Sequence, residues 1–136
     1  MGIQNDESLR EIFESRTIAV VGCSSTPGKA AHDVPRYLQD QGYDIVPVNP
    51  HADEILGRES VDSLRDVDHE IDVVSIFRPS EEVPDIVDDV LERDDVTVLW
   101  TQLGIVNDEA ADRARDAGIT VVQDRCMKVE HRRLSG

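Results

Sequence analysis

The sequence predicts an α/β fold, with a doubly wound parallel sheet of five strands in a single domain covering residues 1–136. Two observations predict this fold. Short apolar stretches alternate along the chain with longer stretches in which apolar residues recur at helical spacing, and this alternation is typical of a parallel sheet covered by helices. The first apolar stretch also runs directly into a loop of glycine and small residues, which is where such sheets bind ligands.

The first helix is expected over residues 5–15, and a buried strand follows over residues 17–22. The strand is apolar on both faces, as expected for the middle of a parallel sheet. We expect the second helix to begin between Ala30 and Asp33, because Pro35 is tolerated only in the first turn of a helix.

The middle of the chain continues this alternation, with a second strand predicted over residues 43–48 and a third over residues 71–77. The polar segment 51–66 between them is expected to be irregular, with a short extended piece at 54–57. A helix with a clear apolar stripe follows the third strand, and Ser80 is expected to cap its N-terminus.

A fourth strand is predicted over residues 96–100 and a fifth over residues 119–122, separated by a helix that Asn107 caps. Residues 124–134 then form the only basic cluster of the sequence. The plainer interpretation of this tail is a solvated end that complements a helix dipole, and the alternative is that it binds a phosphate group.

The sequence is strongly acidic, with 29 Asp and Glu residues against 14 Lys and Arg residues and a net charge of −15. Only Lys29 and Lys128 are lysines. Because nucleic acids and anionic membranes attract basic surfaces, this balance argues against both as partners. Scarce lysine and dispersed acids resemble the proteins of salt-loving archaea, so we expect a halophilic protein whose melting temperature rises with KCl.

No apolar run is long enough to span a membrane, and the N-terminus lacks the apolar core of a signal peptide, so a cytoplasmic protein is expected. Cys23 and Cys126 lie far apart and are expected to be free thiols. None of the histidines has metal-ligand spacing, so no metal is expected. The sequence leaves open whether the protein forms a homo-oligomer.

The loop from Gly22 to Lys29 carries the strongest functional signal. Its small residues let backbone N–H groups approach a ligand closely, and the N-terminus of the following helix adds a partial positive charge. The loop therefore predicts a cradle for a phosphate or diphosphate. The alternative is that Gly22 and Gly28 only permit a tight turn, and that Ser24 and Ser25 are ordinary turn residues.

The patterns of the common nucleotide loops are absent. The spacing from Gly22 to Gly28 is not GxGxxG, and the second strand ends in Val48-Asn49-Pro50 without an Asp or Glu to bind ribose hydroxyls, which counts against a nicotinamide dinucleotide. A Walker loop is also absent, because Lys29 is not followed by Ser or Thr.

Six groups of residues, the first of them in the loop just described, carry a resemblance to a known family. They are Gly22-x-Ser-Ser-x-Pro-Gly28, Gly42-Tyr43 with Pro47-Val48-Asn49-Pro50, Glu54-Ile55-Leu56-Gly57, Phe77-Arg78-Pro79-Ser80-Glu81, Trp100-Thr101-Gln102-Leu103-Gly104, and Asp124-Arg125-Cys126-Met127-Lys128-x-Glu130-His131. In this order they resemble the small stand-alone CoA-binding proteins, which are similar to the N-terminal CoA-binding domain of the succinyl-CoA synthetase α subunit and of ADP-forming acyl-CoA synthetases. The resemblance covers Leu9 to Leu134 and implies a Rossmann-like domain that binds coenzyme A.

The resemblance also implies a binding site. In the synthetases the first loop holds the phosphates of coenzyme A, and the loops after the next three strands complete the site. Carried over to this sequence, the cofactor-binding residues are Gly22, Ser24, Ser25, Thr26, Pro27, Gly28, Lys29, Val48, Asn49, Pro50, Phe77, Arg78, Pro79, Thr101, Gln102 and Leu103. The synthetases have a lysine after the second strand where this sequence has Pro50-His51-Ala52, so Lys29 or Arg78 would replace that phosphate contact.

The sequence therefore predicts a protein that binds coenzyme A or an acyl-CoA and has no identifiable catalysis of its own. The phosphorylated histidine and the nucleotide site of the synthetases belong to further domains that are not expected here. The alternatives are a nicotinamide-dependent or thiol-based oxidoreductase, or a detached subunit of an acyl-CoA synthetase. For the thiol-based alternative, the step to test is a mixed disulfide between the CoA thiol and Cys23 or Cys126, although a buried, inert cysteine is the plainer interpretation.

Overall fold

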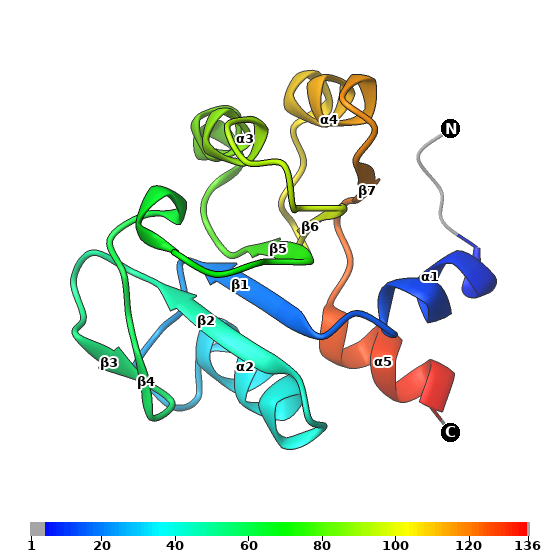
Figure 1. Ribbon diagram of the computed structural model, residues 1–136. Helices are drawn as coiled ribbons and strands as arrows, with labels where there is room; N and C mark the ends of the chain where they lie inside the picture. The colour runs from blue at the N-terminus through cyan, green and yellow to red at the C-terminus, as the bar shows by residue number, and fades with distance from the viewer. Residues whose placement is uncertain (1–4, 136) are drawn as a thin grey trace.

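The computed structural model describes residues 5–135 and contains a central parallel sheet between two layers of helices (Figure 1). The sheet has the strand order β2-β1-β5-β6-β7. Its strands are β1 (Thr17–Val21), β2 (Asp44–Val48), β5 (Val73–Ile76), β6 (Val98–Thr101) and β7 (Thr120–Val122). The helices are α1 (Asp6–Ile12), α2 (Ala30–Asp40), α3 (Val83–Leu91), α4 (Asp108–Asp116) and α5 (Met127–Ser135), with short 3-10 turns η1 (Leu64–Asp66) and η2 (Ser80–Glu82). The predicted Rossmann-like, doubly wound sheet of five parallel strands is confirmed.

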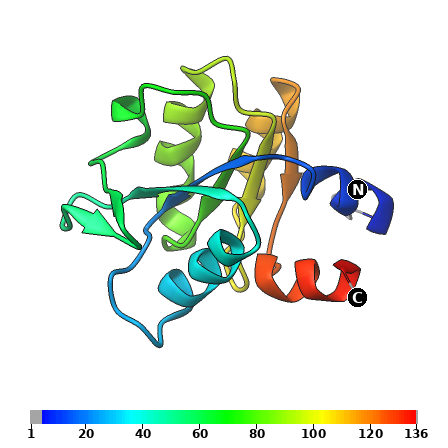
Figure 2. The same ribbon diagram turned by 60° about the horizontal axis from the view of Figure 1, so that its bottom comes forward.

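The two faces of the sheet are covered by different helices. Helices α3 and α4 cover one face, and α1, α2 and α5 cover the other (Figures 1 and 2). Strand β1 is buried on both sides, because Ile18 and Val20 belong to the core under α1, α2 and α5, whereas Ala19 belongs to the core under α3 and α4. The chain leaves the neighbouring strands β1 and β5 toward opposite faces, so the switch point of the sheet lies between their carboxyl ends.

Helix α2 begins at Ala30, within the predicted window, but Pro35 is not in its first turn. Proline has no backbone N–H, so the carbonyl of Ala31, four residues earlier, lacks its helical donor. The backbone N–H of Ser24 donates to that carbonyl instead, at 3.0 Å. The expectation about Pro35 was therefore wrong, because a loop amide takes over the hydrogen bond that the proline removes.

The segment predicted to be irregular contains a small hairpin. Strands β3 (Glu54–Ile55) and β4 (Arg58–Glu59) pair antiparallel, and Leu56 and Gly57 between them both have positive φ. Only half of the predicted extended piece is thus strand. A bridge from Val48 to Val61 ties this segment to the outer strand β2, which places residues 60–62 beside the carboxyl end of the sheet.

Of the two predicted helix caps, one is confirmed and one is wrong. The side chain of Asn107 accepts a hydrogen bond from the Ala110 N–H at 3.0 Å and caps α4 as predicted. Ser80 makes no such bond to α3, because its hydroxyl accepts from the backbone N–H of Val106. Ser80 therefore joins the loops after β5 and β6 instead of capping a helix.

The basic tail forms α5, a helix that the sequence did not predict. Its start is held by Gln102, whose side-chain oxygen accepts the backbone N–H of Met127 at 3.1 Å. Near its end, Arg133 pairs with Asp6 of α1 and with Glu130. These ion pairs, and the basic residues in the last turn of α5, agree with the plainer interpretation of the tail.

Among residues 5–135, no helix is long and apolar enough to cross a membrane.

Candidate functional site

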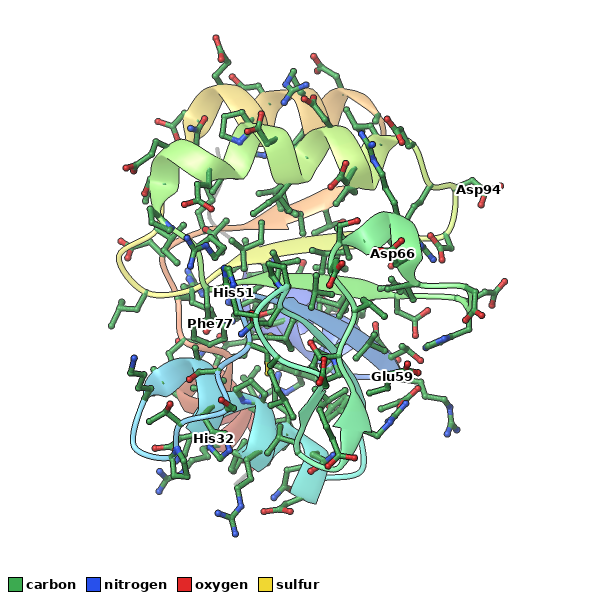
Figure 3. The ribbon with its side chains drawn as sticks, turned by 90° about the vertical axis from the view of Figure 1, so that its left-hand side faces the viewer. His32, His51, Glu59, Asp66, Phe77 and Asp94 are labelled. Carbon is green, nitrogen blue, oxygen red and sulfur yellow. The ribbon has the colours of Figure 1, made fainter. Side chains whose placement is uncertain are left out.

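A cavity of about 290 Å³ lies at the switch point of the sheet, beside the carboxyl ends of β1, β2 and β5. It is lined by Val21, Gly22, Val48, Asn49, Pro50, His51, Asp62, Arg78, Glu82 and Ile86. In Figure 3 this edge of the sheet carries His51 and Phe77, whereas Asp94, which precedes β6, lies at the opposite edge. Ligands of doubly wound sheets bind at such a switch point, so this cavity is the candidate site.

Gly22 shapes the wall of the cavity. Its backbone has φ +87°, and a Cβ atom at this position would lie 2.8 Å from Cδ of Arg78 and 3.1 Å from the carbonyl oxygen of Phe77. Its N–H donates to the carbonyl of Val48 at 2.9 Å, which joins the ends of β1 and β2. Glycine is therefore required at position 22 for two reasons: the backbone has a positive φ, and the aliphatic part of Arg78 lies where a Cβ atom would be.

Arg78 is the cationic group of the cavity, and Glu82 holds it. The Nε of Arg78 donates to Oε1 of Glu82 at 2.9 Å, and its Nη2 donates to Oε2 at 2.8 Å. These hydrogen bonds raise the pKa of Arg78 and lower the pKa of Glu82, so both groups stay charged. Both side chains remain nearly half exposed, so the pair is accessible from the cavity.

Several backbone amides of the loop between β1 and α2 already donate hydrogen bonds within the protein, among them the Lys29 N–H to the carbonyl of Thr26 at 3.4 Å. Besides the bond from Ser24 to α2, the Thr26 N–H donates to the Ser24 hydroxyl at 3.0 Å, and the Gly28 N–H donates to Oδ1 of Asp33 at 3.1 Å. The predicted cradle is therefore partly filled by side chains of the protein itself. Pro27 and Lys29 are exposed parts of the same loop.

Asp33 is a carboxylate surrounded by donors and positive charge. Its Oδ1 also lies 3.3 Å from Nδ1 of His32. The pKa of Asp33 lies below its ordinary value because of the hydrogen bond from Gly28, then the contact with His32, with a smaller contribution from the charge of Lys128. The start of α2 thus forms an anion-binding environment that the protein fills with its own anion.

Both polar atoms of the Asn49 side chain make hydrogen bonds within the protein. Its Nδ2 donates to the carbonyl of Cys23 at 2.8 Å, and its Oδ1 accepts the backbone N–H of His51 at 2.8 Å. Asn49 therefore ties the loop after β1 to the loop after β2. Its backbone and that of Pro50 still line the cavity.

The site residues predicted at the end of β6 and just after it do not line the cavity. Thr101 and Gln102 are buried, and the amide of Gln102 joins the Ser75 hydroxyl at 2.7 Å to the start of α5. Leu103 is 72% exposed. Phe77 packs against the core under α1, α2 and α5. Neither Phe77 nor the exposed Pro79 lines the cavity.

The cavity thus brings together five of the predicted residues, namely Gly22, Val48, Asn49, Pro50 and Arg78. It adds three polar side chains that the sequence analysis did not select: His51, Asp62 and Glu82. Only Glu82 had a sequence signal, since an acid four residues after an arginine can pair with it on a helical turn. Asp62 reaches the cavity through the pairing of β2 with the hairpin segment, which the sequence did not predict.

The two thiols have very different environments. Cys23 is fully buried, and burial raises the pKa of its thiol to about 12, whereas Cys126 is only partly buried. We expect iodoacetamide at pH 8 to alkylate Cys126 in the folded protein and to spare Cys23 until the protein is unfolded, because the thiolate is the reacting species. Intact mass and peptide mapping measure this, and C126S should abolish labelling of the folded protein. Labelling of Cys23 without unfolding would contradict the expectation.

The doubly wound sheet, with its cavity at the switch point, places this protein in the Rossmann-like class of nucleotide-binding folds. Within that class, residues 16–132 match the family described as CoA binding domain. The chain belongs to this CoA-binding domain family, as its sequence motifs indicated.

Its relatives fall into two groups. The uncharacterized protein YneT of Bacillus subtilis is 45% identical over 124 residues, which cover 90% of this chain and 91% of YneT. The solved structure of a hypothetical protein from Pyrococcus horikoshii superposes with a TM-score of 0.95 at 37% identity, covering 100% of this chain and 96% of that chain. An ADP-forming acetate–CoA ligase of Archaeoglobus fulgidus is 36% identical over 81 residues, which are 58% of this chain but only 12% of the ligase.

Proposed function

We propose that this protein binds coenzyme A or an acyl-CoA at the cavity between the ends of β1, β2 and β5, without catalysis of its own. The observation that carries the proposal is the placement of Arg78 against Gly22 at the switch point, in a family of CoA-binding domains. An arginine fork matches the oxygens of a phosphate, and coenzyme A carries several phosphate groups.

The loop from Gly22 to Lys29 is proposed to contribute the second part of the site. The two lysines of the chain support this, because both lie around the start of α2: Lys29 directly precedes the helix, and the charge of Lys128 acts on Asp33. In a chain with a net charge of −15, such local cations are what an anionic ligand needs.

One observation favours a second candidate. The sequence has no acidic residue at the end of β2 to bind ribose hydroxyls, but Asp62 brings a carboxylate to the same cavity. A nicotinamide dinucleotide is therefore the second candidate ligand of this cavity. A thiol-based oxidoreductase has less support, because Cys23 is buried and Cys126, although partly exposed, does not line the cavity. A synthetase subunit would need the partner chains that correspond to the rest of the ligase.

A thermal-shift panel in about 2 M KCl tests the proposal with CoA, acetyl-CoA, NAD, NADP and ATP. A ligand present at 100 times its dissociation constant should add about 2.7 kcal/mol of stability. We expect CoA or acetyl-CoA to raise the melting temperature, and R78A to remove most of that shift. A shift with NAD and none with CoA would reverse the order of the two candidates.

A further inference from the structure

Both groups that would hold phosphates in the proposed site are occupied by carboxylates of the protein itself. At the cavity, the fork of Arg78 makes two hydrogen bonds to the two oxygens of Glu82. At the loop, the Gly28 N–H donates to Asp33, whose Oδ1 also faces His32. A carboxylate and a phosphate present similar oxygens to such donors, and arginine binds both through the same fork.

The surroundings of these two carboxylates favour their displacement by a ligand. Asp33 and Glu82 are both 44% exposed, and exposed ion pairs contribute little free energy. Each of the two also lies close to a helix N-terminus, Asp33 in the first turn of α2 and Glu82 directly before α3. A carboxylate released from its partner would therefore still be stabilised by the positive end of the helix dipole and by contact with water.

We propose that Glu82 and Asp33 occupy the two phosphate positions of the empty protein and that a ligand binds by displacing them, so that these two carboxylates set its affinity. The inference rests on the proposed function and deepens it. Glu82 and Arg78 line the cavity, whereas Asp33 lies outside it, beside Lys128. The ligand class that the two positions select is therefore a nucleotide with phosphates at two separate places, as in coenzyme A, rather than one with a single phosphate.

The matched test removes one charge at a time. E82Q and D33N keep the shape of the side chain and weaken its hold on the donor, so each should lower the dissociation constant for CoA about three- to fivefold. Isothermal titration calorimetry in about 2 M KCl measures this. D88N is the control, because it also removes one negative charge and one ion pair, between Asp88 of α3 and Arg113 of α4, but that pair includes no residue of the cavity and makes no bond to the loop from Gly22 to Lys29. Its affinity for CoA should stay within twofold of wild type.

Unchanged or weaker CoA binding in both E82Q and D33N would overturn the inference, since the carboxylates would then only position their partners. A gain of the same size in D88N would overturn it too, because the effect would come from net charge alone. If the wild-type protein does not bind CoA, the proposed function fails by itself. The inference is then decided with inorganic pyrophosphate: a larger thermal shift in E82Q and D33N than in wild type and D88N supports it, and equal shifts overturn it.

Discussion

Replacing Gly22 by alanine is expected to abolish CoA binding and to lower the free energy of unfolding by about 1–3 kcal/mol. The stability loss arises because an L-residue is strained at φ +87°. The binding loss arises because the new Cβ would lie 2.8 Å from Cδ of Arg78, so that the arginine stem must leave its place on the cavity wall. Urea unfolding and calorimetric titration with CoA measure the two effects.

Gly118 supplies the matched control. It has nearly the same backbone conformation, φ +89°, but a Cβ there would meet no atom within 4 Å, and the residue follows α4, away from the cavity. G118A should therefore lose a similar amount of stability while its affinity for CoA is unchanged. If G22A bound CoA as tightly as G118A does, the position of Arg78 against Gly22 would have no part in binding.

Raising KCl from about 0.1 M to about 2 M is expected to raise the melting temperature by about 10 °C or more. The reason is the repulsion within a chain of net charge −15. The acids are dense on α3 and α4, which lie side by side (Figure 1) and carry Asp85, Asp88, Asp112 and Asp116. Salt shortens the range of this repulsion from about 10 Å at 0.1 M to about 3 Å at 1 M.

A variant with fewer charges separates this screening from a general effect of salt on apolar burial. Asp53 and Glu70 are exposed, and neither is in any of the ion pairs found among residues 5–135. The double variant D53N/E70Q should melt at a higher temperature than wild type in low salt and should gain less from KCl. Melting temperatures that stay flat from low to molar KCl would remove the halophile interpretation.

The strands could be predicted from the sequence because each is a local apolar run, and their observed bounds differ by only one or two residues. Asn107 was also predicted correctly, since its cap involves Ala110 in the same turn. Ser80 and α5 were not, because their partners are remote. Ser80 binds Val106, and α5 is started by Gln102, so neither contact leaves a pattern in the neighbouring sequence.

The residues of the candidate site also divide into those that the sequence could predict and those that it could not. Gly22 and Arg78 could be predicted because the resemblance fixes their places at the ends of two strands. Thr101 and Gln102 belong to an equally suggestive motif, but their side chains make hydrogen bonds within the fold, to Ile105, to Ser75 and to the start of α5. A motif shows that residues recur together, and it does not distinguish a contact to a ligand from a contact within the fold.

Pro35 makes the geometry of the loop between β1 and α2 depend on the interior of that helix. An amino acid with an N–H at this position would compete for the Ala31 carbonyl and release Ser24 from it. Because this backbone hydrogen bond joins the loop to the interior of α2, a movement of the helix would change the shape of the loop even where no side chain connects them.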